Sequence, residues 1–202
     1  MTILVFDCET TGLINYKTQT YPYIVQLSWI VYSDHITEHN HIIRPKIPIP
    51  EVSIAIHKIT QERADKEGIP IEAAIYLLSK DWNNAHTIIA HNMSFDLAVL
   101  KKECERNNLS VLNYHKPFYC TMKNSIELCK LVTKSTRNPD ETYLKYPKLI
   151  ELFHHLFPTE TISNLHDALV DNIVCLRCYY MMTQNIDLCD NPTFKERFTS
   201  LT

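Results

Sequence analysis

Glycine is nearly absent from this sequence, with only Gly12 and Gly68 among 202 residues. Long apolar runs are also absent, and the first one is interrupted by Asp7 after a few residues and has no basic region before it. A signal peptide, a membrane span and membrane contact are therefore not expected. Because glycine is so rare, Gly12 is expected in a turn whose backbone requires a positive φ angle.

An excess of positive charge is absent as well. Lysine and arginine total 20 against 23 aspartates and glutamates, and the formal net charge is -3. This balance excludes a broad basic field that would capture duplex nucleic acid at long range. Any contact with nucleic acid is expected to be local.

The seven cysteines do not indicate a disulfide framework, because their number is odd and several fall inside apolar helical patterns. They suit reduced thiols in an intracellular compartment such as the cytoplasm or the nucleoid. Cys175 and Cys178 have the spacing of half a zinc site, but no second pair follows, so core packing is the favoured interpretation.

The pattern of apolar residues predicts a single α/β domain, since 45% of the residues are hydrophobic and 21% are charged. The first part of the chain is expected to form strands over 3–6, 23–32 and 35–44, followed by a short helix over 51–57 and a polar loop to 70. A helix over 71–82, a strand over 87–90 and a helix over 93–106 are expected next. The rest is expected to form a strand at 118–121 that leads into a helix to about 132, a polar loop over 133–146, and helices over 147–156 and 167–182. This order predicts a mixed central sheet with helices on both faces. The weakly patterned segment 183–202 is expected to be a tail or a short extra helix.

Two carboxylates end the first apolar strand. Asp7 and Glu9 are two residues apart, so their side chains are expected on the same face. Like charges this close raise each other's pKa unless a cation lies between them, which indicates a metal site. The alternative is a helix N-terminus with acids in its first turn, and this stretch alone does not decide between the two.

Two further acids are expected near the same edge of the sheet. Ligands gather at the carboxyl ends of strands in α/β sheets, and the strand over 87–90 runs into a helix whose first turn contains Asp96. Such an acid is ordinarily a surface residue that complements the helix dipole. Asp171 lies in a helix that is apolar on both sides, so its carboxylate needs a cation or hydrogen-bond donors.

Three segments resemble, in order and spacing, the motifs of the DEDDh 3′-to-5′ exonucleases, a ribonuclease-H-like family that includes the proofreading subunit of bacterial replicative polymerase. They are Phe6–Leu13, His91–Asp96 and His166–Asp171. Each motif is weak alone, and the three together are highly specific. The resemblance covers residues 1–182 and implies an exonuclease domain over that range.

The resemblance also implies a role for individual residues. The metal-binding acids would be Asp7, Glu9, Asp96 and Asp171, and the general base would be His166. Contacts with the terminal nucleotide would come from Thr10, Thr11, Gly12, Leu13, His57, Asn92 and Phe95. The family usually has glycine where Lys58 stands, and it has threonine or leucine more often than Cys8, whose side chain is expected to point away from the site.

These residue types suit phosphodiester hydrolysis. Two divalent ions about 3.5 to 4 Å apart can activate a water and stabilise the leaving oxygen, and oxygen ligands select Mg²⁺ or Mn²⁺. An imidazole is largely neutral near pH 7 and can accept the proton of that water. On one continuous helix His166 would lie about 140° from Asp171, so it is expected on the loop before the helix. Without the resemblance, a surface histidine is the simpler interpretation.

The sequence therefore predicts a two-metal exonuclease that releases 5′-mononucleotides from the 3′ end of a nucleic acid. DNA is favoured over RNA, and single-stranded or mismatched ends over paired ones. The 202 residues contain no polymerase domain, so a proofreading role would require a DNA polymerase partner in trans. The alternatives are a ribonuclease of the same fold, an inactive nucleic-acid-binding module, which would be expected to have lost an acid or the histidine, and a phosphatase, which would not need Leu13, His57 and Phe95 for stacking.

Overall fold

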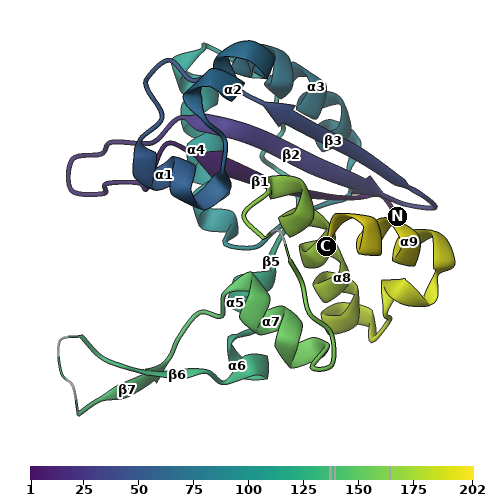
Figure 1. Ribbon diagram of the computed structural model, residues 1–202. Coiled ribbons are helices and arrows are strands. Elements are labelled where there is room, and N and C mark those ends of the chain that lie inside the picture. Colours follow the sequence, from purple (N-terminus) through teal and green to yellow (C-terminus); the bar gives the residue numbers. More distant parts are fainter. Residues whose placement is uncertain (137, 139, 164) are drawn as a thin grey trace.

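A five-stranded sheet forms the centre of the computed structural model, which describes residues 1–136, 138, 140–163 and 165–202. The strands lie in the order β3-β2-β1-β4-β5 (Figure 1). Their bounds are Ile3–Thr10 for β1, Ile24–Tyr32 for β2, Ile36–Ile42 for β3, Thr87–Ala90 for β4 and Phe118–Cys120 for β5. Because β1 pairs antiparallel with β2 and parallel with β4, the sheet is mixed, as predicted.

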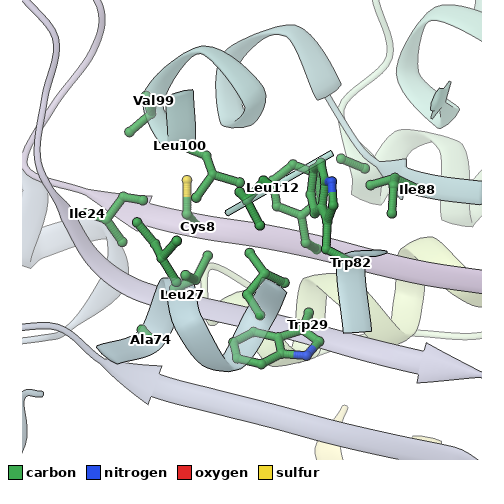
Figure 2. Close-up of a cluster of buried hydrophobic side chains, with 14 of the residues drawn as sticks. Cys8, Ile24, Leu27, Trp29, Ala74, Trp82, Ile88, Val99, Leu100 and Leu112 are labelled. Atoms are coloured by element: carbon green, nitrogen blue, oxygen red, sulfur yellow. The ribbon is translucent and has the colours of Figure 1, made fainter. Parts of the chain in front are cut away.

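Strand β1 lies in the middle of the sheet because it is apolar on both faces. Leu4 and Phe6 point to one face, where they join a buried cluster with α3 (Ile71–Asn84) and α4 (Met93–Arg106). Figure 2 shows this cluster, in which Trp82 from α3 lies close to side chains of the sheet. This layer holds the sheet against the helix that carries Asp96.

The other face of β1 is covered by helices from the C-terminal part of the chain. Ile3 and Val5 pack in a second cluster with α7 (Leu149–Leu156), α8 (Ala168–Gln184) and α9 (Pro192–Leu201). Nearly every residue in the first three turns of α8 is buried, as expected for a helix apolar on both sides. Helices on both faces of a mixed sheet confirm the predicted fold class.

The segment between the third strand and residue 70 contains more helix than expected. The short helix α1 (Glu51–His57) was predicted, but the polar loop after it contains α2 (Gln61–Glu67). The Thr60 side chain caps α2 by accepting a hydrogen bond of 3.1 Å from the backbone N–H of Arg63. This threonine cap stabilises a helix with little apolar patterning, so the prediction of a loop was wrong.

The single helix predicted from β5 to about residue 132 was also wrong. Two single turns replace it, α5 (Thr121–Asn124) and α6 (Ile126–Cys129). Ser125 lies between them, and its hydroxyl donates to the backbone oxygen of Met122 at 3.1 Å. A serine that hydrogen-bonds the backbone in this way competes with the helical pattern, which explains the break.

A hairpin replaces part of the polar loop expected over 133–146. Its strands, β6 (Val132–Lys134) and β7 (Thr142–Leu144), pair antiparallel, and the hairpin projects away from the rest of the molecule (Figure 1). Because much of both strands is exposed, the sequence has no apolar alternation that would reveal them.

The C-terminal segment packs on the core. A 3₁₀ turn (Leu188–Asp190) precedes α9, whose Phe194 and Phe198 are buried, and Phe198 stacks on Phe153 at 6.1 Å between ring centres. The division of the chain at residue 182 stays a prediction. None of the helices in the described part of the chain has the length and apolar character that crossing a membrane requires.

Candidate active site

Asp7 and Glu9 lie at the carboxyl end of β1, on the face of the sheet that α8 covers. In the ladder with β2, Asp7 pairs with Ser28 and Glu9 pairs with Gln26. Both carboxyl-bearing residues are half-buried. Their neighbours across the strands are neutral, so two adjacent carboxylates are withdrawn from water without a positive side chain beside them on the ladder.

Helix α8 brings Asp171 to the same place. Asp167 caps the helix by accepting a hydrogen bond of 2.9 Å from the backbone N–H of Leu169, and Asp171 lies one turn further along. One side-chain oxygen or nitrogen from each of Glu9, His166 and Asp171 lies within 4.8 Å of the other two. Three such groups at this spacing could hold a cation.

Asp96 approaches from the other layer. It lies in the first turn of α4, is 3% exposed, and accepts a hydrogen bond of 3.3 Å from the Cys8 thiol. The Cys8 side chain therefore points away from Asp7 and Glu9, as expected, yet it contacts the fourth acid. The expectation for Cys8 was incomplete. Its side chain leaves the face of Asp7 and Glu9, but on the opposite face of the sheet it meets Asp96.

Burial is the main cause that raises the pKa of all four acids. The charges of neighbouring acids raise it further, and Asp7 is the centre of this repulsion because Asp96, Asp171 and Glu9 all contribute to it. The hydrogen bond from Cys8 acts in the opposite direction on Asp96. No lysine or arginine forms an ion pair with these carboxyls among the described residues.

The site fits a divalent cation. The Oδ1 atom of Asp171 is buried and has no hydrogen-bond partner in the described part of the chain. A buried acceptor left without a partner costs about 1 to 3 kcal/mol, and a cation would remove this cost together with the repulsion between the acids. Carboxylate oxygens are hard ligands of the kind that Mg²⁺ and Mn²⁺ prefer.

His166 lies on the loop immediately before α8. It is exposed, and its backbone has a φ of 71°, a left-handed conformation that is uncommon for a residue with a side chain. The hydrogen bond between its backbone and the Asp171 carboxyl helps to hold this conformation. The imidazole therefore lies beside the acids without being part of the helix.

A cavity of about 680 Å³ opens next to these groups. Of the predicted site residues, those that line it are Asp7, Leu13, Asn92, Phe95, His166 and Asp171. Leu13 is 85% exposed, so its apolar side chain is free to be covered by a ligand. An aromatic ring and an exposed leucine beside a cavity of this size could contact the flat face of a base.

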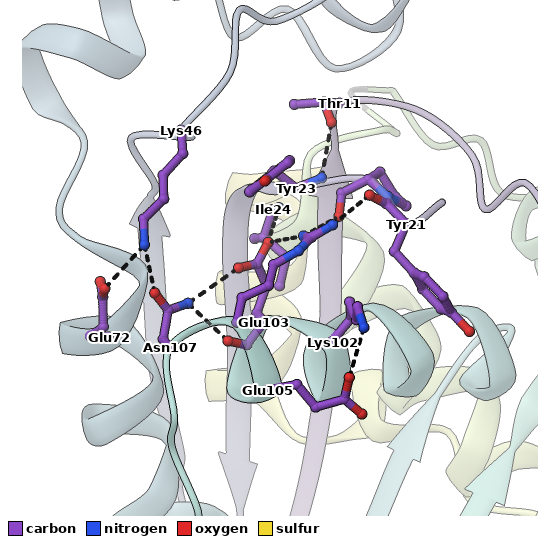
Figure 3. Close-up of polar contacts among 12 residues, drawn as sticks. Thr11, Tyr21, Tyr23, Ile24, Lys46, Glu72, Lys102, Glu103, Glu105 and Asn107 are labelled. Carbon is purple, nitrogen blue, oxygen red and sulfur yellow. Dashed lines mark hydrogen bonds and ion pairs between the residues drawn. The ribbon is translucent and has the colours of Figure 1, made fainter. Parts of the chain in front are cut away.

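Three of the predicted substrate residues shape the turn that presents Leu13. The Thr10 hydroxyl donates to the Gly12 carbonyl at 2.7 Å, and the Thr11 hydroxyl accepts from the Tyr23 backbone at 2.9 Å (Figure 3). Gly12 has a φ of 155°, which residues with a side chain rarely adopt, in agreement with the expected positive φ. These residues are not among those that line the cavity.

Asn92 directly precedes α4, but its side chain does not cap the helix. Its backbone is left-handed, with φ 70° and ψ 39°, and no cap hydrogen bond forms. The usual N-cap conformation is extended, which explains why this side chain does not meet the helical N–H groups. The amide instead lines the cavity.

His57 does not line the cavity. It is 6% exposed at the end of α1, its Nδ1 accepts from the Ile59 backbone at 3.1 Å, and its ring lies beside the Thr10 backbone. Burial lowers its pKa. Lys58 follows with a φ of 61°, so a lysine adopts the left-handed conformation for which glycine is better suited. A contact of His57 with a nucleotide stays a prediction.

Two residues at the cavity were missed by reasoning from the sequence. His91 bridges the Thr121 hydroxyl and the Pro147 carbonyl at 2.9 and 3.0 Å, and burial lowers its pKa to about 4. Asn172 is fully buried, and neither of its side-chain polar atoms has a hydrogen-bond partner among the residues described. The available signal for Asn172 was a second polar residue, directly after Asp171, in the first turns of a helix that is apolar on both sides.

The segment after the first turn is held by α4. Glu103 is 2% exposed and accepts from the Ile24 backbone at 3.4 Å, and Arg106 donates to the carbonyls of Pro22 and Tyr21 at 2.8 and 2.6 Å. Figure 3 shows these contacts reaching from α4 to the start of β2. They fix the chain that pairs with Thr11, and therefore the turn that carries Leu13.

Comparison with known proteins places this geometry in a family context. A family model described as an exonuclease (RNase_T) matches residues 4–179. The chain is 25% identical over 154 residues to the PolC-type DNA polymerase III of Latilactobacillus sakei, and spans 10% of the length of that protein. It is 23% identical over 212 residues to the DNA polymerase III subunit epsilon of Buchnera aphidicola, covering 98% of this chain and 81% of that protein.

Solved structures share the fold. The nuclease domain of 3′hExo, a DEDDh family member bound to rAMP, aligns with a TM-score of 0.68 at 13% identity, over 92% of this chain and 93% of that one. Exonuclease X in complex with 5′ overhanging duplex DNA aligns with a TM-score of 0.57 at 24% identity, over 93% and 98% of the two chains. These likenesses confirm the ribonuclease-H-like fold that the sequence motifs implied.

Proposed function

Since this chain belongs to the RNase_T exonuclease family, we propose that it is a metal-dependent 3′-to-5′ exonuclease that releases 5′-mononucleotides from single-stranded or mismatched DNA ends. The observation that carries the proposal is the convergence of Asp7, Glu9, Asp96 and Asp171, whose pKa values are all raised by burial. Two divalent cations, Mg²⁺ or Mn²⁺, would supply an activated water and stabilise the leaving oxygen at these carboxylates.

The protein's own residues orient the reaction. Cys8 holds the Asp96 carboxylate from the opposite layer, and the backbone of His166 holds Asp171. The exposed imidazole of His166 would accept the proton of the attacking water at a ring nitrogen, since it lies beside Glu9 and Asp171 and lines the cavity. General-base catalysis of this kind contributes about 10² to 10⁴-fold to a rate.

The cavity favours one frayed terminal nucleotide over an internal loop. Leu13 and Phe95 would cover the base, while Asn92 offers an amide at the same wall. Stacking is worth about 1 to 3 kcal/mol per base, which is comparable with the cost of opening a mismatched end. Single-stranded and mismatched 3′ ends should therefore be degraded faster than paired ends.

DNA is the preferred substrate in this proposal because the matched relatives are DNA polymerase III proteins and exonuclease X is seen with duplex DNA. A polymerase that acts in trans is the corresponding partner, as the epsilon relative is a polymerase subunit. Trimming of RNA 3′ ends is the second candidate, because 3′hExo of the same fold is seen with rAMP.

The test is digestion of 5′-labelled oligonucleotides in Mg²⁺ or Mn²⁺. Single-stranded DNA, a duplex with a mismatched 3′ end, a fully paired duplex and RNA of the same sequence should be compared. The proposal expects a ladder that shortens from the 3′ end, release of 5′-mononucleotides, and loss of all activity in EDTA.

Asp7→Ala should abolish most hydrolysis while keeping the fold, and Glu127→Ala, an exposed acid of α6, is the matched control. Hydrolysis of DNA by Asp7→Ala at the wild-type rate would place the metal site elsewhere. Cleavage of a circular single strand would instead indicate an endonuclease, and a strong preference for the RNA oligonucleotide would favour the second candidate.

A further inference from the structure

The β6–β7 hairpin is attached to the wall of the cavity. His91 at the end of β4 contacts the Pro147 carbonyl at 3.0 Å, and the backbone N–H of Lys145 donates to Leu131 at 2.8 Å, which extends the ladder toward the body of the protein. Residues 146–150, which follow β7, line the cavity. The base of the hairpin therefore belongs to the same wall as the proposed nucleotide site.

The register of the hairpin sorts its side chains onto two faces. Lys134 pairs with Thr142 and Val132 pairs with Leu144, so these four side chains share one face. Tyr143 pairs with Thr133 and lies on the other face. We refer to the face of Lys134, Val132, Thr142 and Leu144 as the lysine face.

The lysine face combines charge with exposed apolar surface. Val132 is 62% exposed, Lys134 is exposed, and neither Lys134 nor Lys130 at the start of the hairpin forms an ion pair among the described residues. The neighbouring acid Glu141 is opposite Ser135, in register with the Tyr143 face. Lys134 and Glu141 therefore lie on opposite faces of the hairpin. Lys145 lies on the Tyr143 face, where it pairs with Glu151.

Tyr146 is the residue that links the cavity to the end of the hairpin. This tyrosine lines the cavity, is 54% exposed, and is an even number of residues from Leu144 along the extended ladder. The hairpin and the loop after Leu13 project on the same side of the molecule (Figure 1). A strand whose 3′ end lies in the cavity would leave it between these two projections.

We propose that the lysine face of the β6–β7 hairpin binds the single-stranded nucleic acid upstream of the terminal nucleotide, with Lys134 on a phosphate and Tyr146 and Val132 against bases. The proposal rests on the proposed function, because it takes the cavity as the site of the 3′ end. A positive groove with aromatic and apolar platforms is the usual way in which proteins follow a single strand without reading its sequence. Lys134 pairs with Thr142, which is four residues, or about 13 Å of strand, from Tyr146. A dinucleotide bound in the cavity therefore ends before it reaches Lys134.

The experiment compares a dinucleotide with a 12-nucleotide single strand for wild type, Lys134→Ala, Tyr146→Ala, Tyr143→Ala and Lys80→Ala. Lys80 is an exposed lysine of α3 in the opposite layer, and Tyr143 tests the other face of the same hairpin. Turnover is measured in Mn²⁺ and in Mg²⁺, and binding of the 12-mer is measured in EDTA at several salt concentrations. Thermal unfolding verifies that each variant is folded.

Lys134→Ala should weaken binding of the 12-mer about fivefold or more and reduce its salt slope by about 0.7, the value for one phosphate contact on a single strand. Dinucleotide turnover should be unchanged, and Tyr143→Ala and Lys80→Ala should match the wild type. Tyr146→Ala should weaken the 12-mer by about 5- to 150-fold, the range expected for a lost stacking contact.

The proposal is overturned if Lys134→Ala binds the 12-mer within twofold of the wild type with the same salt slope. It is also overturned if Tyr143→Ala loses as much affinity as Lys134→Ala, because the lysine face would then not be the specific binding face of the hairpin. Suppose that Lys134→Ala weakens binding of the 12-mer, but the wild type hydrolyses neither substrate in Mn²⁺ or Mg²⁺. This result would refute the proposed function and leave the strand-binding face supported.

Discussion

The metal-free protein should lose stability as the pH rises, and divalent cations should restore it. Burial, and then the charges of neighbouring acids, raise the pKa of Asp7, Glu9, Asp96 and Asp171. A carboxyl with a higher pKa in the folded than in the unfolded chain binds more protons when folded. The free energy of unfolding therefore falls as the pH rises from about 4 through the folded-state pKa values.

Asp171 sets the magnitude. Burial raises its pKa from 3.8 to about 7, against the hydrogen bond from His166. Because one pKa unit corresponds to about 1.4 kcal/mol, ionising this group costs about 4 kcal/mol in all, most of which is lost as the pH rises from about 4 to 7. The four carboxyls interact, so their costs do not add, and this value is the scale for the cluster. The full cost corresponds to about 8 to 16 °C in melting temperature for a chain of this size. Over pH 7 to 8.5 the decrease is smaller, because Asp171 is then already largely ionised. Glu9, whose pKa burial raises to about 8, contributes about 1.2 kcal/mol in that range, or about 2 to 5 °C.

Buried histidines titrate in the opposite sense and set the range of the assay. Burial lowers the pKa of His91 from 6.5 to about 4, so its contribution to stability is lost as the pH falls below about 6.5. Burial also lowers the pKa of His41 and His57. Between pH 7 and 8.5 these rings are largely neutral in both states, and the acids dominate the profile.

The assay is thermal unfolding between pH 7 and 8.5 in EDTA, and again in millimolar Mg²⁺ or Mn²⁺. The wild type in EDTA should melt at a lower temperature as the pH rises, and the cation should raise the melting temperature most at pH 8.5. Asp7→Asn should flatten the pH dependence and weaken the effect of the cation, whereas the exposed control Glu127→Gln should change neither. A melting temperature that stays constant or rises with pH in EDTA, and that ignores both cations, would refute the reasoning.

Three further predictions concern individual residues and ends. His166→Ala should lower the single-turnover rate at saturating Mg²⁺ by about 10² to 10⁴-fold, and His166→Gln should behave similarly. If the pH profiles of variant and wild type are parallel and the rates agree within a few-fold, His166 is a surface histidine. Asn172→Leu should increase the free energy of urea unfolding by about 1 to 3 kcal/mol, because it removes two buried polar atoms without partners, and a loss of stability would mean that the amide has partners in solution. A duplex with a mismatched 3′ end should be shortened faster than a paired one in a 5′-label time course, and equal rates would argue against capture of a frayed nucleotide.

Much of the candidate site follows from periodicity that is local in the sequence. Asp7 and Glu9 share a face because strand side chains alternate, and their neighbours in β1 are buried on both faces as expected. Asp171 could be recognised as a buried acid because α8 is apolar on both sides. His166 could be placed before that helix because, at 3.6 residues per turn, it would otherwise lie about 140° from Asp171. These features require only the residues within one element.

Features with little apolar patterning were not predictable in the same way. Helix α2 depends on the cap by Thr60, and the β6–β7 hairpin is a pairing of short, largely exposed strands. The helix expected after β5 is broken by the hydrogen bond of Ser125 to its own turn. In each case hydrogen bonds to the backbone decide the structure, and they are compatible with many polar sequences.

The tertiary structure alone decided which groups meet. Cys8 contacts Asp96 across 88 residues of sequence, and His91 fastens the hairpin base through a contact with Pro147, 56 residues away. Asn172 could be seen as polar in the sequence, but its lack of partners depends on the packing of α8. The sequence by itself determined the faces of β1 and α8, because alternation and helical period are properties of a single element. Contacts between elements depend on how the layers pack, and no local sequence pattern encodes which residues of two layers come close together.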